Sequence, residues 1–227
     1  MYDIVRQEIE ELKRRNYKWN DLFDIVKIFE DKISKYTGAP YVTVTDCCTH
    51  ALELSFRYLQ GKQTIGTVSL PAYTYLSVPM MLSKIGIKFE LQDIDWKGYY
   101  YFEPTNVIDM ATRFTKDCYI PGSHSCVSFG LKKVLKIMNG GAIMTDDEEA
   151  HKWFQHARYD GRDLANIPWT KQKTFDLGYH YYLGVEDCAR GIILMDEMAK
   201  NGPHNKDSTK SGKLDYPNLA NLFLNFQ

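Results

Sequence analysis

The stretch "YVTVTDCCTHALELSFRYLQG", residues 41–61, has the pattern of a strand, a tight turn and a helix. Its β-branched beginning, 41–46, favours a strand, and "ALELSFRYLQG" favours a helix. At such a junction the first N–H groups of the helix and its dipole converge on one spot, which suits an anion. The turn 46–52 could therefore cradle a phosphate, with Thr49 supplying a hydroxyl. The alternative is an ordinary helix cap made by Thr49 or Asp46.

Strands and helices alternate along the rest of the chain. Two helices are predicted within residues 3–36. Further strands are predicted at 64–71, 87–95, 106–111, 125–129 and 140–147, and helices at 75–86, 147–161 and 185–202. This order predicts an α/β domain over 1–200 with a parallel or mixed sheet, in which ligands bind at the C-terminal ends of strands. Residues 201–227 read as a mobile polar linker followed by a short apolar tail that could dock on another surface.

Composition excludes several classes of protein. The 227 residues are 44% hydrophobic and carry a formal net charge of -1, so we expect a folded core and no attraction to nucleic acid or to an anionic membrane. No apolar run reaches the roughly 18 residues of a membrane span, and the charged N-terminus lacks a signal-peptide core, so we expect a cytoplasmic protein. The five cysteines form no C-x-x-C, and His151 and His156 are wrongly spaced for one helix face, so we expect no disulfide framework and no metal site.

The stretch "SFGLKKVLKIMNGG", residues 128–141, contains three lysines. Lys132 and Lys136 would share a face if the segment were helical, and all three lysines could simply be solvated. Lys133 differs in having apolar neighbours, with Ser128 five residues before it and a glycine pair close behind. A lysine in an apolar pocket has a depressed pKa and becomes a nucleophilic amine.

Two further features have open interpretations. Asp109 ends the apolar strand in "NVIDMA", where its carboxylate could hold a cationic ring nitrogen or a metal, or merely cap a helix or form a surface ion pair. Tyr179, Tyr181 and Tyr182 lie close together in sequence, and such aromatic clusters are more often packing than a site.

In this order, the segments resemble the DegT/StrS family of sugar aminotransferases, which are pyridoxal 5'-phosphate (PLP) enzymes. The resemblance covers roughly residues 26–190. It is carried by "FEDKISKYTGAPYVTVTDCCTHALELSF", "LPAYTYLSVPMMLSKIGIKFELQDID", "NVIDMATRF", "SFGLKKVLKIMNGGAIMTDDEE", "ARYDGRD" and "LGYHYYLGVEDCARG". It implies the large domain of an aspartate-aminotransferase-like (fold type I) PLP-transferase, with a reduced mixed sheet and helices on both faces.

The resemblance also implies roles for particular residues. Lys133 falls on the family's Schiff-base lysine, and Asp109 on the carboxylate that pairs with the pyridinium nitrogen. The remaining cofactor contacts fall on Ser128, Thr49 and the backbone at Cys48 and His50 for the phosphate, on Tyr75 and Ala111 against the ring, on Thr112 near the phenolic oxygen, and on His180, which would reach the phosphate of a partner subunit. A homodimer with its active site at the subunit interface is therefore expected.

The chain departs from the family pattern in several places. "WKGYYYFEPTN", residues 96–106, replaces at least one β–α unit, which predicts the loss of a strand. The resemblance ends near residue 190, and from residues 201–227 we expect the family's C-terminal small domain to be absent. Cys48 stands in place of a glycine, His180 in place of an asparagine and Tyr182 in place of an arginine.

The activity implied by the resemblance is transfer of an amino group from an amino acid, by analogy glutamate, to a keto group of a nucleotide-linked sugar. A PLP enzyme of another type, such as a dehydratase or lyase, is an alternative because the substrate-binding segments are altered. A degenerate, non-catalytic binding or scaffold protein is another. A separate chain could also supply the missing substrate-binding parts.

Overall fold

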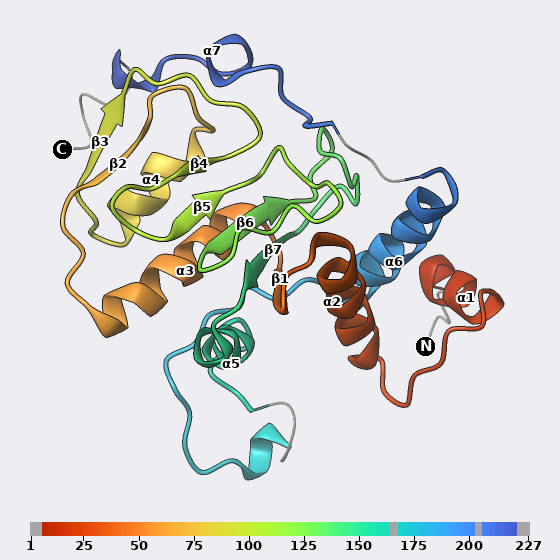
Figure 1. Ribbon diagram of the computed structural model, residues 1–227. Coiled ribbons are helices and arrows are strands. Elements are labelled where there is room, and N and C mark those ends of the chain that lie inside the picture. The colour runs from red at the N-terminus through yellow and green to blue at the C-terminus, as the bar shows by residue number, and fades with distance from the viewer. Residues whose placement is uncertain (1–5, 164–167, 203–205, 222–227) are drawn as a thin grey trace.

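The computed structural model describes residues 6–163, 168–202 and 206–221 (Figure 1). The expected strands and helices all appear in it, with ends that differ by a few residues, and two short elements at 100–101 and 212–215 are additional. In chain order they are α1 (Gln7–Arg14), α2 (Asp24–Thr37), β1 (Tyr41–Thr45), α3 (Cys48–Lys62), β2 (Val68–Pro71), α4 (Ser77–Lys84), β3 (Phe89–Gln92), β4 (Tyr100–Tyr101), β5 (Val107–Asp109), β6 (His124–Ser128), β7 (Gly141–Thr145), α5 (Glu148–Ala157), α6 (Val185–Lys200) and α7 (Gly212–Asp215).

The strands form a mixed sheet, as the sequence predicts. Five of them are ordered β1-β7-β6-β5-β4, and β2 pairs with β3 in parallel. The two parts meet at one bridge, where the backbone N–H of Ser69 donates to Glu103 over 2.8 Å and that of Glu103 donates back over 3.1 Å. Strand β5 runs parallel to β6, whereas β7 is antiparallel to both β1 and β6.

The connection 96–106 does not leave a gap in this sheet. It contributes β4, a strand of two residues that runs antiparallel to β5 and places Tyr100 opposite Asp109. Its continuation pairs with β2 through Glu103. The place between β2 and β5 is thus filled by a short strand in the opposite direction, where the sequence predicts only a loss.

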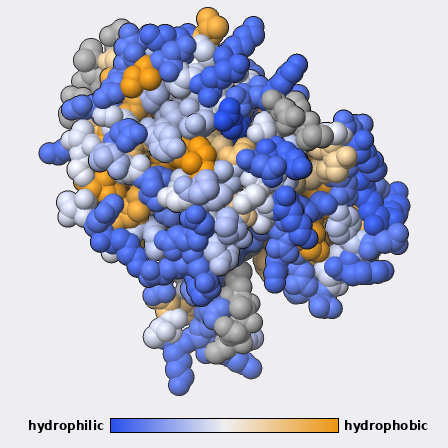
Figure 2. Space-filling model, viewed as in Figure 1, coloured by the Kyte–Doolittle hydropathy of each residue, from blue (hydrophilic) through white to orange (hydrophobic). Residues whose placement is uncertain are grey.

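Helices cover both faces of the sheet (Figure 1). On β7, Ala142 and Met144 join the apolar cluster that also contains the buried side chains of α2 and α6, whereas Ile143 joins the cluster of α3, α4 and α5. This alternation follows from the period of two along a strand. Most large apolar residues are used in these two clusters, and the face seen in Figure 2 is mainly polar, with small separate apolar patches.

Residues 206–221 are bound to the domain. Asp207 forms an ion pair with Arg113 over 2.9 Å, the N–H of Ser208 donates to the Thr112 carbonyl over 2.7 Å, and the N–H of Leu219 donates to the carbonyl of Ala72 over 2.9 Å. Within the predicted linker over 201–213, Asp207 and Ser208 thus find partners on the domain surface. Of the tail after this linker, 214–227, residues 222–227 lie outside the described residues.

No helix in the described ranges combines the length and the apolar character that crossing a bilayer requires.

The start of β7 approaches the start of α3 so closely that only glycine fits. A Cβ on Gly141 would lie 2.5 Å from the backbone nitrogen of Cys48. We expect Gly141→Ala to lower the free energy of unfolding by about 1–3 kcal/mol, the usual cost of overpacking, as measured by urea denaturation. Gly61→Ala is the matched control, because a Cβ there meets nothing within 4 Å. Equal stability of the two variants would contradict this close approach.

Buried His124 on β6 makes the stability of the fold sensitive to acid. Burial lowers the pKa of His124 from 6.5 to about 4. Between these values the unfolded chain binds a proton that the folded chain does not, so the folded state loses stability as the pH falls. From the pKa shift, this loss amounts to about 3 kcal/mol.

We expect His124→Gln to reduce the fall in unfolding free energy between pH 7 and pH 4 by about 2–3 kcal/mol. Urea denaturation at both pH values checks this. If the unfolding free energy of His124→Gln falls between pH 7 and pH 4 as much as that of the wild type, other groups cause the fall.

Candidate active site

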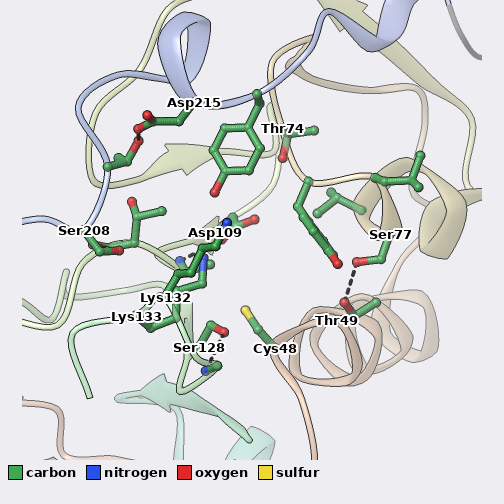
Figure 3. Close-up of a pocket in the computed structure, with 18 of the residues that line it drawn as sticks. Cys48, Thr49, Thr74, Ser77, Asp109, Ser128, Lys132, Lys133, Ser208 and Asp215 are labelled. Carbon is green, nitrogen blue, oxygen red and sulfur yellow. Dashed lines mark hydrogen bonds between the residues drawn. The ribbon is translucent and has the colours of Figure 1, made fainter. Parts of the chain in front are cut away.

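A cavity of about 900 Å³ opens where β5 and β6 end and α3 and α4 begin (Figure 3). The turn after β6 and the segment 206–221 complete its walls. It brings together eight of the ten residues singled out from the sequence, namely Lys133, Asp109, Ser128, Cys48, Thr49, Tyr75, Ala111 and Thr112. His50 and His180 do not line it.

Asp109 supplies a buried carboxylate to this cavity, with only 4% of its surface exposed. One carboxylate oxygen accepts the N–H of Ala111 over 2.8 Å, and the other accepts the hydroxyl of Tyr100 over 2.7 Å. Burial raises the pKa of Asp109, while these two hydrogen bonds and the charge of Lys133 oppose the rise. Each oxygen keeps a lone pair, so the carboxylate can still accept a hydrogen bond from a donor in the cavity.

The three lysines of 128–141 lie in turn and irregular structure outside any helix, so Lys132 and Lys136 do not share a helix face. Lys132 and Lys133 line the cavity and Lys136 does not (Figure 3). Lys133 is half-buried, and within the described part of the chain its ammonium group has no hydrogen bond or ion pair. It is an unpaired lysine side chain in the same cavity as the buried Asp109 carboxylate.

The start of α3 offers unused donors to an anion. Cys47 caps this helix by accepting the N–H of His50 on its sulfur over 3.4 Å, so neither Thr49 nor Asp46 is the cap that the sequence predicts. The backbone N–H groups of Cys48 and Thr49 donate to no described residue. The first turn carries no acidic residue.

Hydroxyl groups surround the same spot. The Thr49 hydroxyl lies 2.6 Å from that of Ser77 at the start of α4, and the Ser128 oxygen accepts the N–H of Gly130 over 3.4 Å. All three hydroxyls line the cavity (Figure 3). With the free N–H groups, they form a site that fits a phosphate.

The substitution of Cys48 for glycine is accommodated. Cys48 is the first residue of α3 and is not among the residues with positive φ, so its Cβ causes no backbone strain. Burial, and then the nearby Asp109 charge, raise the pKa of the Cys48 thiol well above its usual range. The thiol is therefore a neutral, buried wall of the cavity.

His50 is not part of the cavity lining. Its ring stacks on Tyr181 with centroids 3.6 Å apart, and its Nδ1 lies 2.7 Å from the Asp46 carboxylate. Burial lowers the pKa of His50, but hydrogen bonds with Asp46 and Cys47 outweigh it and raise the pKa to about 9. The imidazole is thus a cation on the first turn of α3. The possible ligand atoms of Asp46, Cys47 and His50 lie within 4.8 Å of one another, a proximity that sequence reasoning missed.

His180 is exposed and lies 3.2 Å from the Asp160 carboxylate, away from the cavity of its own chain. The neighbouring tyrosines are engaged in ring contacts. Tyr182 stacks on Tyr159 with centroids 4.9 Å apart, and Tyr179 stacks on Tyr181 at 5.3 Å.

The remaining candidates lie at the cavity wall. Thr112 is buried, and its hydroxyl donates to the carbonyl of Gly98 over 3.0 Å. Tyr75 is 64% exposed at the rim, so its ring is accessible to a ligand. Ala111 lies two residues after Asp109 in the chain, and its backbone N–H donates to the Asp109 carboxylate.

Sequence reasoning missed several cavity residues. Thr74, Ser77 and Trp96 lie close in sequence to the expected site but carry no distinctive pattern, and Ser208, Thr209 and Tyr216 come from the segment read as linker and tail. Tyr100, which contacts Asp109, lies in the connection that departs from the family. Its pairing with β5 could not be read from spacing alone.

The fold is shared with solved aminotransferases. A sugar aminotransferase from Micromonospora echinospora is 15% identical with a TM-score of 0.67, over 88% of this chain and 67% of its own. A putative PLP-dependent aminotransferase from Bacillus cereus is 17% identical with a TM-score of 0.63, over 86% of this chain and 63% of its own. A Helicobacter pylori aminotransferase involved in the biosynthesis of pseudoaminic acid is 16% identical with a TM-score of 0.63, over 88% of this chain and 64% of its own.

These likenesses establish the fold, and this chain spans about two thirds of each of these proteins. No curated protein matches it in sequence. A sequence model of one family does match, over residues 3–120, which is more than half of the chain. The match includes the start of α3, Tyr75 and Asp109. The chain therefore belongs to the DegT/DnrJ/EryC1/StrS aminotransferase family.

Proposed function

We propose that the cavity binds PLP and that Lys133 holds the cofactor covalently through its Nζ. The observation that carries this proposal is that an unpaired lysine and a buried carboxylate line the same cavity. Asp109 would accept a hydrogen bond from the protonated ring nitrogen of the cofactor, since its oxygens have capacity for a further donor.

The cofactor's phosphate would lie at the start of α3. Two free N–H groups, three hydroxyls and the positive end of the helix dipole are what a dianion requires. The His50 imidazolium adds a positive charge near the same helix turn. Tyr75 and Ala111 would contact the ring, and Thr112 would lie on the side of its phenolic oxygen.

The chemistry divides between cofactor and chain. When bound, PLP supplies an electron sink that makes a proton on the α carbon of an amino acid removable. Once the amino donor has displaced Lys133 from the cofactor, its freed Nζ would take that proton and return it as general acid. Asp109, kept ionised by Tyr100 and Ala111, would hold the proton on the ring nitrogen.

The reaction we propose is transfer of the amino group from an amino acid, glutamate by analogy, to a keto group of a nucleotide-linked sugar. Its support is the family and the sugar aminotransferases that share the fold. The cavity volume of about 900 Å³ can take a cofactor together with part of a substrate. We further propose a homodimer in which His180, exposed on its own chain, reaches the phosphate of the partner.

The test is the absorbance spectrum of the purified protein with added PLP, before and after borohydride reduction, followed by peptide mass mapping. We expect a yellow protein with a pyridoxyl group fixed on Lys133. Added glutamate should then change the spectrum in a half-reaction, and a panel of nucleotide-linked keto-sugars should accept the amine. A colourless protein without an adduct would refute this function and favour a scaffold role.

A further inference from the structure

We propose that Tyr100 is a positioning residue that holds the Asp109 carboxylate ionised and fixed toward the cofactor. This inference rests on the proposed function and adds a residue from the connection that replaces the family's β–α unit. The supporting geometry is a buried chain of hydrogen bonds that ends on Asp109.

The chain of hydrogen bonds runs through Thr74, Tyr100 and Asp109. The Thr74 hydroxyl lies 2.6 Å from the Tyr100 hydroxyl, which lies 2.7 Å from the Asp109 carboxylate. The three residues are 1%, 6% and 4% exposed. Buried polar groups of this kind cost free energy unless each finds a partner. Removing one of the three hydrogen-bonding groups therefore leaves a neighbour unsatisfied.

Counting protons fixes the direction of these bonds. An ionised carboxylate only accepts, so Tyr100 must spend its single proton on Asp109. Thr74 must then donate to the Tyr100 oxygen. Burial and the Asp109 charge raise the pKa of Tyr100 well above its usual range, so this phenol keeps its proton. Each hydrogen bond in the series therefore has its donor on the side away from Asp109 and its acceptor on the side toward Asp109.

The Tyr100 ring is held from several sides. Trp96 packs against it with centroids 4.9 Å apart, and Phe102 does so at 5.4 Å. The backbone of Tyr100 is fixed by its register opposite Asp109 in the sheet. The short strand β4 thus delivers a rigid donor to the carboxylate, which a loop of the same length would not.

Other groups face Asp109 as well. They are the Ala111 N–H, the Lys133 ammonium, the Cys48 and Cys126 thiols and the Tyr216 phenol. Apart from Tyr100 and the Ala111 N–H, none forms a hydrogen bond with the carboxylate within the described residues. Removing the Tyr100 hydroxyl should therefore raise the proton affinity of Asp109, because a donor to the charged form is lost.

The test measures the dissociation constant of PLP between pH 5 and pH 8. We expect Tyr100→Phe to raise this constant about tenfold at pH 7 and to move its acid limb up by about one pH unit. Tyr101→Phe is the matched control, since this neighbouring side chain is 38% exposed and points away from Asp109. A role confined to packing would not move the acid limb.

Thr74→Val gives a second route if Tyr100→Phe fails to fold. It removes only the donor to Tyr100 and should shift the acid limb in the same direction by a smaller amount. If the PLP dissociation constants of Tyr100→Phe and Thr74→Val rise at the same acid pH as those of the wild type and of Tyr101→Phe, the inference is wrong. If the wild-type protein forms no borohydride adduct, the proposed function itself fails, which is a distinguishable outcome.

Discussion

Replacing Lys133 by alanine is expected to abolish the pyridoxyl adduct and to slow the half-reaction with glutamate by at least about 10³-fold, within the range that positioned acid–base groups contribute. The physical reason is that no other described amine combines partial burial with freedom from ion pairs in this cavity. The adduct is measured by mass spectrometry after borohydride, and the rate by stopped-flow absorbance.

Two neighbours of Lys133 make sharp controls. Lys132 lines the same cavity and Lys136 lies outside it. We expect Lys132→Ala and Lys136→Ala to retain the adduct on Lys133, with at most a modest loss of PLP affinity for Lys132→Ala. An adduct that moves to Lys132, or that survives in Lys133→Ala, would show that the register carried over from the family is wrong.

Asp109→Asn is expected to lower the rate of the half-reaction by about 10²- to 10³-fold, because losing one partner of a buried charge pair costs roughly 2–5 kcal/mol. Asparagine keeps the size of the side chain but cannot hold the ring nitrogen as a cation. Single-turnover absorbance with glutamate checks the rate. A rate within tenfold of the wild type would remove Asp109 from its proposed role.

The same substitution should not destabilise the PLP-free protein. Burial raises the pKa of Asp109 above its value in the unfolded chain. The folded state is therefore favoured by protonated Asp109 at low pH and loses that advantage as the pH rises through the raised pKa. Asparagine carries no charge, so at pH 7 we expect an unfolding free energy equal to or above that of the wild type. Urea denaturation without PLP tests this.

The local patterns of the sequence determined much of the fold. The β-branched run 41–45, the apolar run 107–109 and the cap-to-glycine stretch 147–161 each appear as the element that was predicted. This succeeds because strand and helix periods are properties of short segments. The positions of Lys133 and Asp109 after strands likewise placed both residues at one edge of the sheet, as parallel topology requires.

Tertiary structure decided what depends on pairing between distant segments. The role of Tyr100 follows from its register opposite Asp109, and a two-residue strand has no sequence period of its own. Cys47 caps α3 because the turn's backbone angles, rather than residue preferences, select the acceptor.

The segment 206–221 shows the same division. Its composition predicts a linker, yet the ion pair of Asp207 with Arg113 and the backbone bonds to Thr112 and Ala72 bring it across the cavity. The sequence by itself therefore determined most of the elements and the family, and it singled out the lysine and carboxylate of the proposed site. Only the tertiary structure decided which hydroxyls, N–H groups and chain segments surround them, because those contacts are made by backbone groups and polar side chains far apart in the chain.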